Sequence, residues 1–178
     1  EITSLMWYAL RSVGLPVNYD YIIQWANRSQ SHSWNSLWVD SVLYSFGMSD
    51  PEFGKHFESR PQERVGKVYR KMFSFQPQSL PNQRGALAEG IPPAFRSPFI
   101  KDVSESYFDG IDLVLKLTIP IAAPKKFAYL VVFDNRNWVP VAWSRIKRGR
   151  VAFDHVEKGC AYMVMYYDRG LLLPATDP

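Results

Sequence analysis

From residue 99 onward, the sequence is a series of short segments in which apolar and polar residues alternate. The segments are separated by turn signals, namely Asp-Gly at 109–110 and the stretches "APKK", "DNRN", "KRG" and "DRG". Alternation with a period of two is typical of strands that bury one face, and turns spaced about 8–12 residues apart are typical of antiparallel sandwiches or barrels. We therefore expect strands at 100–107, 111–119, 127–134, 137–143, 150–154, 160–167 and 171–174.

The first sixteen residues, "EITSLMWYALRSVGLP", have the pattern of a helix. Gly14 supplies a stop signal and Pro16 forbids continuation, so the end of this helix is well marked. Residues at helical spacing predict one apolar face, made of Ile2, Leu5, Met6, Ala9, Leu10 and Val13. Because this stripe already includes Ile2, we expect the helix to begin before Glu1, in a part of the protein that the chain lacks.

Three alternating segments follow the helix. They predict strands at 17–22, 32–39 and 42–46, with "DS" at 40–41 turning a hairpin between the last two. The next stretch, "RPQERVGKVYRKMFSF", fits either a helix or a strand, and we favour a strand after a short helical turn.

The middle of the chain, residues 76–98, contains five prolines and reads as an inter-domain linker or a long surface loop. This divides the sequence into residues 1–75, the linker at 76–98, and a β-sandwich at 99–178. The fold class expected from these patterns is α+β.

Composition excludes several classes of protein. Hydrophobic residues make up 47% of the 178 residues, so we expect a packed core rather than disorder. The net charge of +4 is too small and dispersed for a nucleic-acid-binding face, and the basic run "RIKRGR" at 145–150 is explained by a turn between strands. No apolar run reaches the roughly 18 residues of a membrane span. We expect no signal peptide, because the N-terminus has no basic region followed by an apolar one. A single cysteine, Cys160, allows no internal disulfide and no multi-cysteine zinc site.

His32 is the first histidine of the sequence. It lies in "SQSHSWNSLWV", where His32, Trp34, Ser36 and Trp38 share one side of the expected strand. From spacing alone, the imidazole is either a general base or a polar residue on a half-buried sheet. His56 and His155 have no metal-ligand spacing and are interpreted as structural, and we expect neither a metal nor a cofactor.

Two stretches resemble the transglutaminase-like superfamily, which belongs to the papain-like cysteine enzymes. "ALRSVGLPV" (9–17) is similar to the family's "lRalGIPvr" turn, and "HSWN" (32–35) is similar to its "HaWn" motif. The resemblance implies that His32 is the catalytic histidine and that the catalytic cysteine opens the first helix, about two residues upstream of Glu1. It also implies a third residue, an aspartate beyond the next strand, and Asp50 stands at 18 residues after His32.

Longer matches extend the resemblance to a bacterial branch of this family over almost the whole chain. They are "VNYDYIIQWANRSQSHSWNSLW", "GKVYRKMFS" (66–74), "DVSESY" (102–107) and "YLVVFDNRNWVPV" (129–141), the last two within an expected C-terminal β-sandwich. The resemblance implies a fragment of an acyltransferase or amide hydrolase for peptide, protein or peptidoglycan-type amides, inactive by itself because the cysteine is absent. It also implies a periplasmic or cell-surface location.

The same residues also allow interpretations without a catalytic role. Trp25, Trp34 and Asn35 are expected to line a substrate cleft, although a core position is as plausible for each tryptophan. Cys160 is interpreted as a small buried residue rather than a nucleophile. The alternative function is a non-catalytic protein that binds a glycan or peptide through its sandwich and an aromatic cleft.

Overall fold

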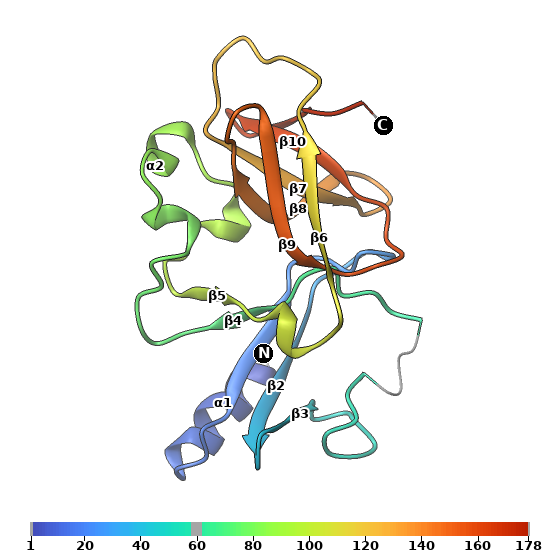
Figure 1. The fold of residues 1–178 in the computed structure, drawn as a ribbon. Coiled ribbons are helices and arrows are strands. Elements are labelled where there is room, and N and C mark those ends of the chain that lie inside the picture. The colour runs from blue at the N-terminus through green and yellow to red at the C-terminus, as the bar shows by residue number, and fades with distance from the viewer. Residues whose placement is uncertain (1, 58–61, 178) are drawn as a thin grey trace.

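The computed structural model describes residues 2–57 and 62–177, and it is β-rich, with antiparallel pairing between the strands of its sheets (Figure 1). One long helix, α1 (Ile2–Ser12), precedes a five-stranded sheet with the order β3-β2-β1-β4-β5. Its strands are β1 (Asn18–Ile22), β2 (His32–Val39), β3 (Val42–Phe46), β4 (Tyr69–Lys71) and β5 (Ile100–Asp102). None of the helices in these residues is long and apolar enough to cross a bilayer.

The second half of the chain forms two further sheets. A four-stranded sheet has the order β11-β10-β7-β8, and β6 pairs with β9 in a two-stranded sheet. The strands are β6 (Ile111–Lys116), β7 (Phe127–Phe133), β8 (Trp138–Arg145), β9 (Arg150–Val156), β10 (Met163–Asp168) and β11 (Leu171–Pro174). Apolar residues of β7 and β10 pack against those of β9 and β6, so these two sheets share one core layer.

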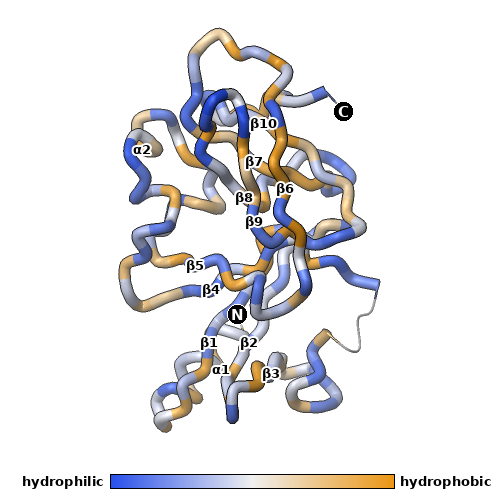
Figure 2. The backbone as a smooth tube through the Cα atoms, viewed as in Figure 1, coloured by the Kyte–Doolittle hydropathy of each residue, from blue (hydrophilic) through white to orange (hydrophobic). Residues whose placement is uncertain are grey.

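The predicted hairpin at 32–46 is confirmed. Val39 pairs with Val42, and Asp40 and Ser41 both have positive φ, at 46° and 66°. Positive φ at both central residues is the requirement of a tight type I′ turn. The basic run at 145–150 likewise contains a turn, because β8 ends at Arg145 and β9 begins at Arg150. The tube is mostly hydrophilic at this end of β9 (Figure 2).

The predicted buried face of α1 is only partly correct, since Met6 and Leu10 pack against the core but the centre of the buried side is Trp7, which was not among its residues. Trp7 is the buried residue of this helix, and Met6 and Leu10 flank it half-buried, whereas Ile2, Leu5 and Val13 are exposed. Trp7 stacks on Phe73 at 4.7 Å and contacts Tyr19 at 5.7 Å between ring centroids. The helix is apolar on two sides, and the larger aromatic surface decides which side is buried.

Residues 76–98, expected to be a linker or surface loop, carry a short helix α2 (Ala86–Glu89) and 3₁₀ turns at Leu80–Asn82 and Pro93–Phe95. Leu80 and Phe95 are fully buried, in a cluster that also contains Tyr69 of β4 and Tyr129 of β7. The segment therefore contributes to a core shared by the five-stranded and four-stranded sheets.

Candidate functional site

His32 is the first residue of β2 and is half-buried, at the mouth of a pocket of about 450 Å³. The pocket lies at one end of the sheet and is lined from both of its faces. Tyr19 and Tyr21 belong to the face that packs against Trp7 of α1, whereas Ile22 and His32 belong to the opposite face. Lys71 in the pocket wall places its ammonium group 3.8 Å from the centre of the Tyr19 ring. The pocket is lined by Tyr19, Tyr21, Ile22, Ser31, His32, Ser33 and Lys71.

The first turn of α1 is fastened to β2 beside His32. The Thr3 hydroxyl donates to the carbonyl oxygen of Ser33 at 3.3 Å, and the Ser33 hydroxyl donates to Thr3 Oγ1 at 3.2 Å. Asn35 adds a third contact, because its Nδ2 donates to the Thr3 carbonyl at 3.3 Å. The N-terminal end of the helix is thereby held next to the strand residue that follows His32.

His32, His56 and Asp50 form a chain of polar contacts, with His56 in the middle. His32 Nε2 lies 2.8 Å from His56 Nε2, and His56 Nδ1 lies 2.6 Å from Asp50 Oδ2. The same carboxylate oxygen accepts the backbone N–H of Gly47 at 2.6 Å. The side chains of His56 and Asp50 are each only 2% exposed. The predicted pair is therefore joined through a second histidine, which was interpreted as structural from the sequence.

Aromatic rings surround the two imidazoles. Trp25 lies 5.3 Å from His32, and Trp34 lies 5.9 Å from His32 and 5.6 Å from His56, measured between ring centroids. The ring of Phe57 meets His56 edge-on at 4.9 Å. These contacts confine both imidazole planes.

The residues expected to line a substrate cleft are all buried in this structure. Trp25 is 1% exposed, and Trp34 and Asn35 are 0% exposed. Within the described part of the chain, Trp25 Nε1 and Asn35 Oδ1 have no hydrogen-bond partner. An unpaired buried polar atom costs about 1–3 kcal/mol and is uncommon enough to mark a place of interest. Their role in binding substrate stays a prediction.

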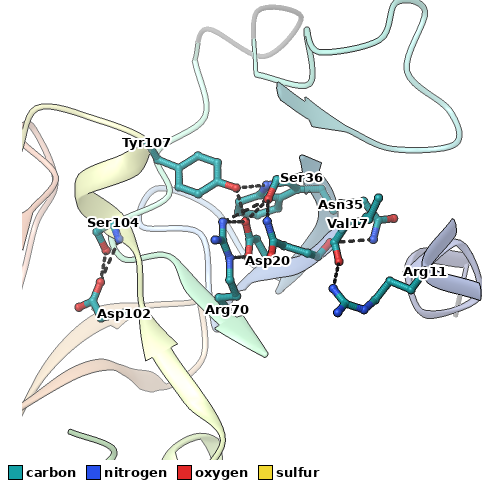
Figure 3. Close-up of polar contacts among 11 residues, drawn as sticks. Arg11, Val17, Asp20, Asn35, Ser36, Arg70, Asp102, Ser104 and Tyr107 are labelled. Atoms are coloured by element: carbon teal, nitrogen blue, oxygen red, sulfur yellow. Dashed lines mark hydrogen bonds and ion pairs between the residues drawn. The ribbon is translucent and has the colours of Figure 1, made fainter. Parts of the chain in front are cut away.

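Next to Trp34, a polar cluster is centred on the buried Asp20, with Ser36, Arg70 and Tyr107 around its carboxyl group (Figure 3). Asp20 is 0% exposed and accepts two hydrogen bonds from the Arg70 guanidinium, each at 2.7 Å. The Ser36 hydroxyl donates to Asp20 Oδ2 at 2.6 Å, and the Tyr107 hydroxyl donates to the same oxygen. The indole N–H of Trp34 donates to the Tyr107 oxygen at 2.9 Å, which links this cluster to the histidine pair.

The electrostatics of this cluster favour a buried ion pair. Burial raises the pKa of the Tyr107 hydroxyl, and the charge of Asp20 raises it further, so Tyr107 is a neutral donor at physiological pH. Burial alone lowers the pKa of Arg70, but its hydrogen bonds to and attraction by Asp20 outweigh this, and the pKa is raised. Arg70 is therefore charged, and its guanidinium donates both hydrogen bonds to the Asp20 carboxyl group.

A second cleft, of about 320 Å³, lies between β4–β5 and the strands β8 and β9. In its wall, the buried ammonium of Lys67 pairs with Asp102 at 2.5 Å and donates to the Asp154 carbonyl at 2.8 Å. The polar and aromatic side chains that line the cleft include Gln78, Asp102, Trp143, Ser144, Arg145 and Asp154.

The remaining candidates have structural surroundings. The Cys160 thiol donates to the Lys158 carbonyl at 3.7 Å, and burial raises its pKa, which disfavours the thiolate. His155 contacts the Phe108 carbonyl and the Gly110 N–H through its Nε2. Among residues 2–57 and 62–177, no group of three or more His, Cys, Asp or Glu side chains is arranged to hold a metal ion.

Sequence reasoning missed His56 and the Asp20 cluster. "GKHFES" has no recognisable spacing, and Asp20 reads as an ordinary polar residue of an alternating strand. Asp20 and Arg70 face each other across the β1–β4 pairing, which brings together residues 50 positions apart. The local signal was the charge of Asp20 inside the alternating segment "VNYDYI".

Comparison of this chain with protein-family models, with curated proteins and with solved structures finds no match. The arguments below therefore depend on the geometry of the site and on the motifs in the sequence.

Proposed function

We propose that the chain is part of a transglutaminase-like cysteine acyltransferase or amide hydrolase, in which His32 is the general base. The observation that carries the proposal is the attachment of the first turn of α1 to β2 beside His32, at the open pocket. A thiol at the N-terminus of this helix would lie beside the start of β2. The His32 side chain is on the face of the strand opposite Ser33 and Asn35, so the thiol would meet the imidazole around the end of the strand. At the N-terminus, the helix dipole would also lower the pKa of the thiol.

The proposed reaction needs three events. His32 takes the thiol proton, and the thiolate attacks the amide carbonyl of the substrate to form a tetrahedral intermediate. His32 then returns the proton to the departing amine, which leaves a thioester on the cysteine. Water or a second amine attacks the thioester, giving a free acid or a new amide and restoring the thiol. Peptide, protein or peptidoglycan-type amides are the proposed substrates.

The test uses the full-length protein, whose sequence must have cysteine about two positions before Glu1. Hydroxylamine traps a thioester as a hydroxamate, so hydroxamate formation from a glutamine-containing peptide measures acyl transfer. Replacing His32 by alanine is expected to lower this rate by about 10²–10⁴-fold, the usual contribution of general-base catalysis. The 178-residue chain alone is expected to form no hydroxamate, because it lacks the nucleophile.

Cys160→Ser is the matched control, because it removes the only thiol of this chain without touching His32. The control is expected to retain the full rate. A residue other than cysteine in the upstream position, or equal rates for wild type and His32→Ala, would refute the proposal.

A second candidate function, glycan binding, is favoured by the 320 Å³ cleft. The half-buried Trp143 ring in its wall offers an apolar face for a sugar, and Gln78, Arg145 and Asp154 offer polar partners for hydroxyl groups. Calorimetric titration with peptidoglycan fragments is expected to show binding that Trp143→Ala weakens about tenfold. Trp138→Ala, on the same strand but packed against Phe133 away from the cleft, should leave the affinity unchanged. Absence of binding to the wild-type chain would remove this candidate.

A further inference from the structure

We propose that His56 is a positioning residue through which the Asp50 carboxylate acts on His32. It sets the tautomer of His32 and stabilises the state that forms when His32 accepts a proton. The proposal deepens the catalytic function above and rests on His32 being its base. It replaces the simple aspartate–histidine pair expected from the sequence with a chain of three side chains, in which His56 is the middle member.

The contacts of His56 are those of a bridge. Its ring plane is within 8° of the His32 plane, and the ring centroids are 5.0 Å apart. Together with the 2.8 Å separation of the two Nε2 atoms, this distance means that the rings meet edge to edge through these nitrogens. The opposite nitrogen, Nδ1, faces Asp50 at 2.6 Å. One imidazole thus touches the carboxylate with one nitrogen and His32 with the other.

The direction of the hydrogen bonds follows from the chemistry of the three groups. An ionised carboxylate only accepts, so His56 Nδ1 carries the proton that it shares with Asp50. A neutral imidazole has one protonated nitrogen, which leaves His56 Nε2 as an acceptor. His32 must then donate from its own Nε2. This order holds His32 in the tautomer whose Nδ1 is the proton-accepting atom.

The chain also stabilises the state that follows proton transfer. When His32 receives the thiol proton on Nδ1, its Nε2–H can pass to His56 Nε2. The positive charge then lies on His56, beside the Asp50 carboxylate, and no net charge is created or lost. Because the side chains of His56 and Asp50 are almost fully buried, this ion pair is little screened by solvent.

The proposal can be tested without catalysis by measuring the histidine tautomers of the 178-residue chain labelled with ¹⁵N-histidine. The chain contains three histidines, so long-range ¹H–¹⁵N spectra give three ring systems. They are assigned with His→Gln variants. At an alkaline pH at which the rings are neutral, we expect His56 to be protonated on Nδ1 and His32 on Nε2.

Replacing Asp50 by alanine is expected to change the His32 spectrum, although a ring lies between the two residues. Without its acceptor, His56 returns toward the Nε2–H tautomer that imidazole prefers in water. It then donates to His32 Nε2, so a substantial fraction of His32 shifts to Nδ1–H. Asp50→Asn is the matched control, because its amide oxygen can still accept from both Gly47 N–H and His56 Nδ1–H. This variant should retain both wild-type tautomers.

His56→Phe provides a second variant, since it keeps a flat ring between Trp34 and Phe57 but removes both nitrogens. In this background, Asp50→Ala should no longer alter the His32 tautomer ratio. A wild-type His56 protonated on Nε2, or a His32 tautomer that responds equally to Asp50→Ala with and without the bridge, would overturn the proposal. Correct tautomers in a full-length protein that forms no hydroxamate would instead refute the proposed function alone.

Discussion

Asp20→Ala is expected to lower the free energy of unfolding by about 3–5 kcal/mol, the usual cost of removing one partner of a buried ion pair. The Arg70 guanidinium, whose side chain is only 13% exposed, would lose its bidentate carboxylate. Ser36 and Tyr107 would lose the oxygen to which they donate. The change therefore leaves one charge and two hydroxyl groups without their acceptor in a place that water reaches poorly.

Urea denaturation followed by circular dichroism measures this loss. Asp109→Ala is the control, because its ion pair with Lys158 is exposed and solvent screens such pairs, so its loss should leave the midpoint almost unchanged. The double variant Asp20→Leu, Arg70→Met should recover part of the stability, since replacing both charges leaves neither unpaired. Equal midpoints for Asp20→Ala and Asp109→Ala would show that the cluster does not stabilise the sheet.

Trp34→Ala should cost a similar amount, about 3–5 kcal/mol, through the cavity that it leaves. Trp34 is fully buried and lies against both imidazoles of the histidine pair. Its indole N–H also donates to Tyr107, so the substitution removes a link to the Asp20 cluster. We expect the His32 and His56 resonances of the variant to broaden or move as their rings lose this support.

Trp38→Ala tests whether the effect depends on burial. Trp38 is on the same strand, but 48% of it is exposed, so its replacement should cost about 1 kcal/mol or less. Circular dichroism is the appropriate probe for both variants, because each removes a fluorophore. A Trp34→Ala midpoint close to that of Trp38→Ala would contradict the packing described here.

The parts of the fold that could be predicted from sequence are those set by local patterns. Strand alternation and turn residues predicted the hairpin at 32–46 and the strand at 171–174 with the bounds observed, and the antiparallel β-rich character is confirmed. Gly14 correctly marked the end of α1, which stops at Ser12. These features depend on residues that are neighbours in the chain.

What could not be predicted depends on contacts between distant residues. The buried side of α1 depends on the contacts of Trp7 with Phe73 and Tyr19. Both residues are outside the helix, so the spacing of apolar residues within it cannot predict these contacts. Only part of the candidate site could be predicted from the sequence. His32 and Asp50 came from motif resemblance, but the ring that joins them comes from a loop without a pattern. Whether these residues perform acyl transfer stays a prediction.

The buried side chains of residues 76–98 have a consequence for cooperativity. Leu80 and Phe95 are fully enclosed between strands from both ends of the chain. Cutting the polypeptide there would not give two independently folded domains, because each piece would expose apolar side chains that are buried in the intact protein. The proline-rich segment thus joins the two parts of the protein into one core. We expect thermal unfolding to occur in a single transition.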